Sequence, residues 1–334
     1  MKKEKITISD IAGKSGVSPA TVSRVLNHRD LVKLETIQQV ERAMAELGCL
    51  SESGSKGIPE PEPLIIMNVP GLDNVFYLKI LAGARVSATA HGYQLLINDA
   101  PINSSSIHSF TELLRQVHAS GVILLNHVPE EQLNLIHAVC PLVQCCEYNA
   151  DSDYPYVSID DYESAKMATE YLISSNCNKI ALINGPRTFK YAVNRQAGFL
   201  DALRQADITI PQDWIVQLPD VNYQMAYSAV CRLLNSDVRP NAFFVISDIF
   251  AAAVIRAAKR FNLNVPQDIL VVGFDNIDFS MMTNPTITTV NQPSFQIGYS
   301  AAELLMESIE HPDIPPKSLT LDTELIIRES TVKR

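Results

Sequence analysis

Five acidic side chains stand directly after predicted buried strands. They are Asp99, Glu147, Asp160, Asp248 and Asp275. In sheets of parallel strands, ligands bind beyond the carboxyl ends of the strands. A carboxylate at such a place accepts hydrogen bonds from a ligand, but it can equally cap the helix that follows. The positions therefore predict a binding cleft, with helix capping as the alternative for each single acid.

Patterns typical of catalysis or metal binding do not occur in the sequence. The seven histidines are scattered, and no nucleophile elbow, phosphate-binding loop or dinucleotide-binding glycine motif follows a strand. The six cysteines lack metal-ligand spacing, and two of them, Cys145 and Cys146, are adjacent. We interpret them as reduced and mostly buried thiols of a cytoplasmic protein. The sequence therefore predicts no enzyme, metal site or cofactor.

The first 50 residues have the pattern of three short helices. Thr7 and Asp10 are spaced like a capping box at the start of the first helix. Ser18 and Pro19 begin the second, because serine suits the N-cap and proline the first helical position. The third is predicted over residues 34–47, and a glycine-containing turn between the first two makes a helix-turn-helix. The apolar positions expected to pack these helices together are Ile8, Ile11, Ala12, Val22, Val25, Leu26, Ile37, Val40, Met44 and Leu47.

The outward face of the second helix carries side chains that suit DNA. Small hydroxyl residues near a helix N-terminus can donate to phosphates, and an arginine can form two hydrogen bonds with a guanine edge. This face comprises Pro19, Ala20, Thr21, Ser23, Arg24 and Asn27. On these features alone, a protein-interaction module with a solvated polar face is the alternative.

The net charge differs between the two parts of the chain. The 334 residues together carry −10, which by itself argues against nucleic-acid binding. Residues 1–33 hold seven basic and three acidic side chains, so they carry +4 and leave −14 on the other 301 residues. We expect a small basic module attached to an acidic body. No apolar run approaches the ~20 residues of a membrane span, and no secretory signal is visible.

Predicted strands and helices alternate from residue 64 onward, which is typical of an α/β fold with doubly wound parallel sheets. A body of about 270 residues exceeds one such unit, so two lobes are expected. The preceding segment is rich in Ser, Gly, Pro and Glu and predicts a linker. The predicted organisation is a headpiece at 1–50, a linker or hinge at 51–63 and a body at 64–334.

Two groups of residues carry a resemblance to a known family. The first is the run Gly16-Val17-Ser18-Pro19-Ala20-Thr21-Val22-Ser23-Arg24, and the second includes Val272-Gly273-Phe274-Asp275-Asn276. They resemble the headpiece and the effector domain of the LacI/GalR family of bacterial transcription regulators, in particular its cytidine-repressor branch. The family's effector domain is similar to a periplasmic sugar-binding protein. The resemblance implies two lobes, 64–160 with 291–322 and 161–290 with 323–334.

The resemblance also implies how the headpiece contacts DNA. Pro19, Ala20 and Arg24 occupy positions that read bases. Positions that contact phosphate or set the docking angle are held by Thr7, Ser18, Thr21, Ser23 and Asn27. In the linker, Ile58 is the candidate for an apolar wedge in the minor groove, although the family's usual Ala-Arg-x-Leu hinge signature is absent.

A small-molecule site between the lobes is the second implication. Arg195 matches an arginine that holds a polar group of the ligand, and Asp275 matches an aspartate that takes two hydroxyl groups of a sugar or ribose. Phe76 and Tyr77 match an aromatic wall that stacks on a ring. The remaining candidate ligand-binding residues are Glu147, Asp160, Phe189, Tyr191, Val221 and Asp248.

The sequence thus predicts a ligand-responsive, sequence-specific transcriptional regulator that acts as a repressor in the cytoplasm. A homodimer would bind a pseudo-palindromic operator in double-stranded DNA, and a nucleoside or sugar in the cleft would alter its DNA affinity. The alternatives are a cytoplasmic sugar- or nucleoside-binding protein that binds no operator, and a hydrolase of such compounds.

Overall fold

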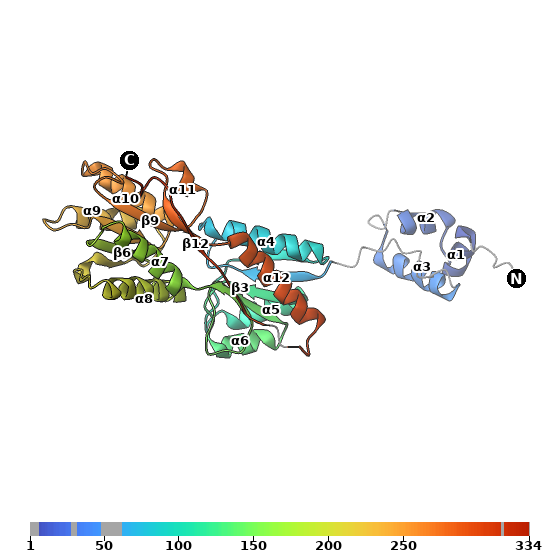
Figure 1. Ribbon diagram of the computed structural model, residues 1–334. Coiled ribbons are helices and arrows are strands. Elements are labelled where there is room, and N and C mark those ends of the chain that lie inside the picture. Colours follow the sequence, from blue (N-terminus) through green and yellow to red (C-terminus); the bar gives the residue numbers. More distant parts are fainter. Residues whose placement is uncertain (1–6, 28–31, 48–61, 315–316, 334) are drawn as a thin grey trace. The chain divides into compact units, whose positions relative to one another are not determined.

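The computed structural model describes residues 7–27, 32–47, 62–314 and 317–333. The chain divides into two compact units, residues 1–62 and residues 63–334 (Figure 1). We call them the headpiece and the body.

The described residues of the headpiece form three helices, α1 (Ile8–Ser15), α2 (Pro19–Asn27) and α3 (Leu34–Glu46). The predicted capping box is present, because Asp10 accepts from the backbone N–H of Thr7 at 2.7 Å and Thr7 accepts in return from that of Asp10. α1 ends at Gly16, whose φ of 70° is accessible to glycine without strain. The buried apolar residues that hold the three helices together are Ile11, Ala12, Val22, Val25, Ile37 and Val40.

Two predicted core residues of the headpiece lie outside this core. Ile8 is 44% exposed and Leu26 is 45% exposed. Ile8 is the first residue of α1, and Leu26 is the last but one of α2. Three short helices enclose only a small core, so the ends of their apolar stripes remain uncovered.

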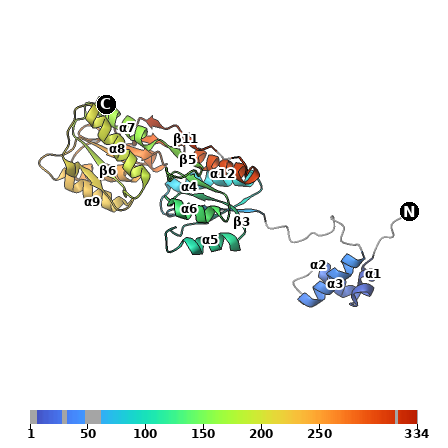
Figure 2. The ribbon, with the colours of Figure 1, turned by 90° about the horizontal axis from the view of Figure 1, so that it is seen from below.

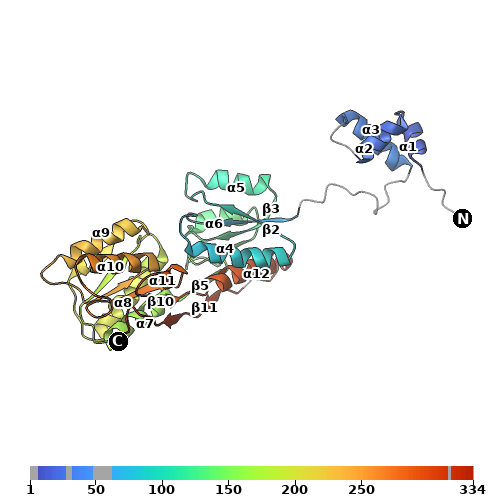
Figure 3. The same cartoon turned by 90° about the horizontal axis from the view of Figure 1, so that it is seen from above.

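The first lobe of the body is built on a six-stranded parallel sheet, in the order β11-β5-β4-β3-β1-β2. Its strands are β1 (Leu64–Asn68), β2 (Gln94–Asn98), β3 (Ala119–Leu124), β4 (Leu142–Cys145), β5 (Tyr156–Ile159) and β11 (Leu319–Leu321). One face is covered by α4 (Phe76–Ala90) and α12 (Ser294–Glu310), the other by α5 (Ile107–Gln116) and α6 (Glu130–His137) (Figure 3).

The second lobe repeats this plan with the strand order β12-β10-β9-β8-β6-β7, in which only the β10–β12 pair is antiparallel. Its strands are β6 (Ile180–Asn184), β7 (Ile215–Gln217), β8 (Ala242–Val245), β9 (Leu270–Asp275), β10 (Thr288–Asn291) and β12 (Glu324–Ile326). Its helices are α7 (Asp161–Ser174), α8 (Lys190–Gln205), α9 (Tyr223–Leu234), α10 (Asp248–Arg260) and the short α11 (Phe279–Met282). α7 packs with α8, and α9 packs with α10, on opposite faces of the sheet (Figure 1).

The chain passes between the two sheets three times: after β5, after β10 and after β11. β11 lies beside β5, although some 160 residues separate them in the sequence (Figure 2). Near the crossings, the Ser164 and Thr323 hydroxyls are hydrogen-bonded at 2.7 Å. Asn291, which the sequence analysis assigned to the first lobe, instead pairs with Asp275 and Glu324 in the second sheet.

α4 and α12 pack closely because each has a glycine at the contact. A Cβ atom on Gly83 would overlap the backbone of Phe295, and one on Gly298 would overlap that of Ile80. This close packing fixes the position of α4, whose first turn lines the cavity described below.

Candidate effector-binding site

A cavity of about 200 Å³ lies between the two lobes of the body. Its walls come from the first turn of α4, the ends of β4, β5 and β9, the start of α8 and the loop after β7. These places agree with the rule that parallel sheets bind ligands beyond the carboxyl ends of their strands. Eight of the ten candidate ligand-binding residues line the cavity: Phe76, Tyr77, Glu147, Phe189, Tyr191, Arg195, Val221 and Asp275.

Asp275 ends β9 and is held with one oxygen engaged by the protein. Its Oδ1 accepts a hydrogen bond of 2.6 Å from Nε2 of Gln292 and lies 3.9 Å from Nη1 of Arg195. Burial raises the pKa of Asp275 to about 6, although Arg195 and Gln292 act to lower it. A buried carboxylate with lone pairs toward the cavity suits a ligand that donates hydrogen bonds, such as a diol.

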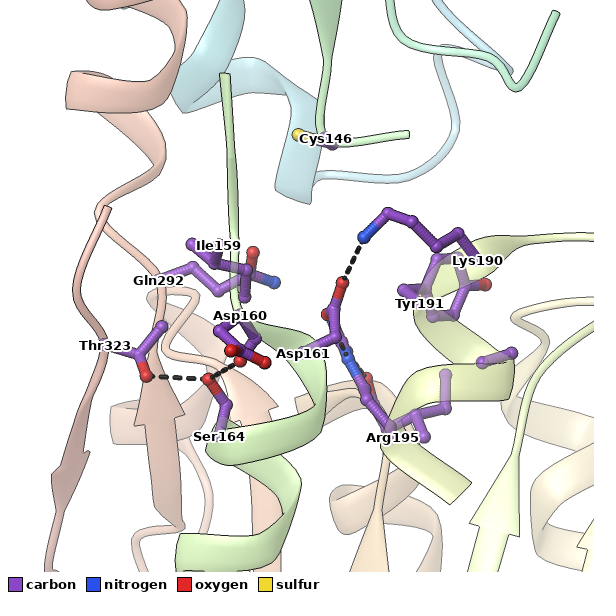
Figure 4. A network of polar contacts seen from close by, with 12 residues as sticks. Cys146, Ile159, Asp160, Asp161, Ser164, Lys190, Tyr191, Arg195, Gln292 and Thr323 are labelled. Carbon is purple, nitrogen blue, oxygen red and sulfur yellow. Dashed lines mark hydrogen bonds and ion pairs between the residues drawn. The ribbon is translucent and has the colours of Figure 1, made fainter. Parts of the chain in front are cut away.

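Arg195 is almost fully buried in the wall of the cavity. Its Nε donates to Oδ1 of Asp161 at 2.9 Å, and its Nη1 donates to the carbonyl oxygen of Ile246 at 2.8 Å (Figure 4). The guanidinium carbon lies 3.5 Å from the centre of the Phe274 ring and 5.0 Å from that of Tyr191. These contacts fix the orientation of a charged donor at the cavity.

Glu147 connects the two lobes. It follows β4 of the first lobe, and its two carboxylate oxygens accept from the backbone N–H groups of Lys190 and Tyr191 at 2.6 and 3.1 Å. Those groups form the N-terminus of α8 in the second lobe. Burial raises the pKa of Glu147, whereas Lys190 and the two backbone hydrogen bonds act to lower it. Glu147, which the sequence predicts as a ligand contact, therefore makes its hydrogen bonds to the other lobe.

Aromatic side chains line the cavity from both lobes. Phe76 and Tyr77 begin α4 with their ring centres 5.5 Å apart in an edge-on arrangement. Phe189 and Tyr191 at the start of α8 are stacked, also at 5.5 Å. Val221 lies in the loop between β7 and α9. A flat ring that enters the cavity meets apolar and aromatic surface on both sides.

Three of the acids singled out in the sequence have other positions. Asp160 is exposed and caps α7, accepting from the backbone N–H of Glu163 at 3.0 Å, so the capping alternative holds for it. Asp99 is exposed beyond the edge strand β2. Asp248 is fully buried behind the cavity wall, and its Oδ2 accepts from the backbone N–H of Ile277 at 2.9 Å.

The contact of Asp248 with Ile277 still bears on the site. Asp275 and Asn276 have φ values of 99° and 51°, so the turn that follows β9 has an uncommon backbone conformation. By accepting from the backbone N–H of Ile277, Asp248 fixes the C-terminal end of this turn. Burial raises the pKa of Asp248 well above its usual range, and the nearby Asp275 raises it further. Asp248 is therefore a positioning residue for Asp275 rather than a part of the lining.

Two charged residues that the sequence analysis did not select complete the site. Asp161 is 3% exposed and receives both Nε of Arg195 and the ammonium group of Lys190, which lies 3.0 Å from its Oδ2 (Figure 4). Lys190 also lies 4.6 Å from the centre of the Tyr148 ring. The adjacent acids Asp160 and Asp161 were a visible signal, but spacing alone does not show which of the two turns inward.

The headpiece presents the predicted DNA-reading residues on an open surface. Pro19, Ala20 and Arg24 are exposed on α2, and Thr21 and Ser23 are half-buried. The hydroxyl of Ser18 accepts from the backbone N–H of Thr21 at 3.1 Å, so it caps α2, as Thr7 caps α1. Asn27 is the last residue of α2, and Ile58 lies outside the described residues. Among the described residues, no helix combines the length and the apolar character needed to cross a membrane.

Comparison with known proteins assigns both units to recognised domain types. Residues 7–50 match bacterial regulatory proteins of the lacI family, and residues 169–331 match the periplasmic binding protein-like domain. The chain is 33% identical over 332 residues to the HTH-type transcriptional repressor CytR of Escherichia coli (strain K12), which covers 97% of this chain and 96% of CytR.

Solved structures show the same architecture. The complex of the transcriptional regulator CelR with cellobiose has a TM-score of 0.72 and 28% identity, covering 98% of this chain and 100% of that one. The lac repressor dimer bound to operator and the anti-inducer ONPF is similar in fold, with a TM-score of 0.74 and 23% identity, covering 99% and 100%. The chain therefore belongs to the LacI family of bacterial transcription regulators.

Proposed function

We propose that this protein is a transcriptional repressor that binds a pseudo-palindromic operator as a homodimer and responds to a nucleoside or sugar in the cavity between its lobes. The observation that carries the proposal is the cavity itself. It combines Asp275 and Arg195, which suit hydroxyl and ring oxygens, with aromatic walls from both lobes. The relative CytR is a repressor, and CelR binds cellobiose in its solved complex.

DNA recognition is assigned to α2. Its exposed Pro19, Ala20 and Arg24 would contact base edges, while Thr7, Ser18, Thr21, Ser23 and Asn27 would contact phosphates or set the docking angle. The hydroxyls of Ser18 and Thr7 cap helices in the free protein, so their effect on DNA binding would come through the position of the helix ends. Ile58 is proposed as the minor-groove wedge. The protein would act in the cytoplasm, where its operator lies.

A second copy of the chain is proposed to cover exposed apolar side chains on the body. Leu78 and Val86 on α4 are about half exposed, as is Met281 on α11, and Met282 is 77% exposed. Exposed apolar patches of this kind mark interaction surfaces. Two-fold symmetry would place two headpieces on two half-sites, so the modest positive charge of one headpiece need not hold DNA alone.

Effector and operator are coupled through the arrangement of the lobes. Glu147 and the ion pair of 2.7 Å between Lys79 on α4 and Asp278 before α11 join the two lobes directly. A ligand that prefers one lobe arrangement, while DNA prefers another, changes DNA affinity, and DNA changes ligand affinity by the same factor.

The test of the proposed function has two parts. Full-length protein is screened by thermal shift with nucleosides, purines and common sugars, since a ligand that binds the folded state raises its Tm. Selection from random DNA then identifies the operator, and the ligand is added to the complex. A stabilising compound that changes operator affinity supports the proposal. Failure to enrich any DNA sequence would instead favour a binding protein without an operator, and turnover of the compound would favour a hydrolase.

Replacing Arg24 with alanine should weaken specific operator binding by about 1–3 kcal/mol, because a bidentate contact with a base contributes that much discrimination. The measurement is a gel-shift titration against the selected operator and a scrambled duplex. Arg42→Ala, which removes an exposed arginine of α3, is the control and should affect both duplexes equally. An unchanged operator footprint and affinity for Arg24→Ala would contradict the assignment.

Effector affinity should fall as pH drops below about 6. The pKa of Asp275 is near 6, so below that value the carboxylate takes up a proton and loses acceptor capacity. A diol that donates to the carboxylate favours its charged form, hence binding releases a proton near this pH. For binding to the charged form alone, the Kd at pH 5 should be about tenfold higher than at pH 7. Titration calorimetry across this range measures the Kd, and a Kd that is the same at pH 5 and pH 7 would refute the prediction.

A further inference from the structure

Glu147 occupies a place in the cavity where a negatively charged ligand group would otherwise bind. The N-terminus of a helix favours anions, because its free N–H groups and the helix dipole point toward them. At α8 these N–H groups belong to Lys190 and Tyr191, and both already donate to Glu147 at 2.6 and 3.1 Å. The N-cap residue, Phe189, provides no side-chain cap of its own. The first lobe thus supplies the anion for a helix of the second.

The charged residues around the cavity also disfavour an anionic ligand. Of the described residues that line it, five are acidic, Asp73, Glu147, Asp161, Asp220 and Asp275, and one, Arg195, is basic. The charge of Arg195 is compensated by Asp161 at 2.9 Å and by Asp275 at 3.9 Å. The ammonium group of Lys190 is paired with Asp161 at 3.0 Å. Along the described lining, a phosphate would meet an excess of acidic side chains, and both cations named here, Arg195 and Lys190, are already paired with carboxylates.

We infer that the cavity selects uncharged sugars or nucleosides over their phosphorylated forms, and that Glu147 is the residue that determines this specificity. The inference rests on the proposed effector function and narrows its ligand class. Glu147 is 3% exposed, so a ligand phosphate would have to displace a buried carboxylate from α8 or lie against it. A phosphate against the carboxylate of Glu147 would bring two negative charges together in a poorly solvated site, where they repel strongly.

Matched pairs of compounds test the inference on the full-length protein. The pairs are uridine with uridine 5′-monophosphate, adenosine with adenosine 5′-monophosphate, ribose with ribose 5-phosphate, and glucose with glucose 6-phosphate. Kd values are measured by thermal shift and by calorimetry. We expect the neutral member of a pair that binds to do so at least about tenfold more tightly, equivalent to about 1.4 kcal/mol. In Glu147→Ala the freed N–H groups should reduce that ratio about tenfold.

Two further variants keep the test decisive. Asp153→Ala removes an exposed acid from the same connection between β4 and β5 and should leave the ratio unchanged. Glu147→Gln replaces Glu147→Ala if the alanine variant does not fold. Equal binding of both members of a pair by the wild type overturns the inference, as does an unchanged ratio in the Glu147 variant that folds. Either result would leave the proposed effector function standing, whereas binding of no neutral compound would overturn both.

Discussion

Replacing Asp275 with alanine should abolish the effector response while operator binding survives. The carboxylate is the acceptor that the cavity offers to a diol, and one of its oxygens is fixed by Gln292 at 2.6 Å. Hydrogen bonds to a charged group contribute about 1.5–3 kcal/mol each. Losing two of them corresponds to a Kd at least about 100-fold higher. The headpiece is a separate compact unit and keeps its DNA-reading surface.

Two matched variants separate the chemical effect from a backbone effect. Alanine is strained at the φ of 99° that Asp275 adopts, whereas asparagine tolerates such a conformation better. Asp275→Asn should therefore fold like the wild type and still fail to respond. Asp213→Ala, an exposed acid of the same lobe, should respond normally. Calorimetry and gel shifts with effector provide the measurements, and induction that persists in both Asp275 variants would show that the ligand does not use this pocket.

The convergence of parallel strands predicts two of the cavity-lining residues, whereas the other six candidates that line the cavity rest on the family resemblance. Asp275 and Glu147 are recognisable as acids that follow buried strands, and a parallel sheet directs all such positions to one edge. The same rule does not show which neighbour points inward. Successive helical residues differ by about 100° in direction, so one position separates Asp160, which caps α7 outside the cavity, from Asp161, which binds Arg195 inside it.

Elements near the C-terminus were the hardest to predict. β11 and β12 have three residues each and are edge strands, and β11 pairs with β5, which lies far back in the sequence. So short a segment has no periodicity, and long-range pairing decides its structure. α12 is different, because Ile297, Ala301 and Leu305 follow one another at intervals of four and are all buried. The spacing of these three residues alone indicates a helix.

The contacts between the two lobes also cannot be predicted from the sequence. The sequence predicts Glu147 as a ligand contact, but its position opposite α8 depends on how the two sheets face each other. No local pattern encodes that arrangement. Glu147 both joins the two lobes and lines the cavity. The contact between the lobes and the proposed selection of the ligand therefore depend on the same side chain.

Replacing Arg195 with methionine should destabilise the body by about 3–5 kcal/mol, the range for breaking a buried ion pair by removing one partner. Methionine fills much of the volume but leaves Asp161, which is 3% exposed, without its closest partner. Lys190 at 3.0 Å remains as a partial substitute, which places the expected loss near the lower end. The carbonyl oxygen of Ile246 also loses its donor. Urea unfolding of the body, followed by far-ultraviolet circular dichroism, measures the change.

A matched control and a double variant show whether the ion pair is the cause. Arg204→Met removes an arginine from the same helix whose side chain is 79% exposed, and it should cost less than about 1 kcal/mol. The double variant Asp161→Asn, Arg195→Met should recover part of the loss, because the carboxylate that Arg195→Met leaves without its arginine is gone, although the ammonium group of Lys190 then loses its partner. If Arg195→Met lies within about 1 kcal/mol of the wild type, Arg195 is not held as a structural ion pair. Its guanidinium would then be free to serve the ligand alone, and the cavity wall would not depend on it.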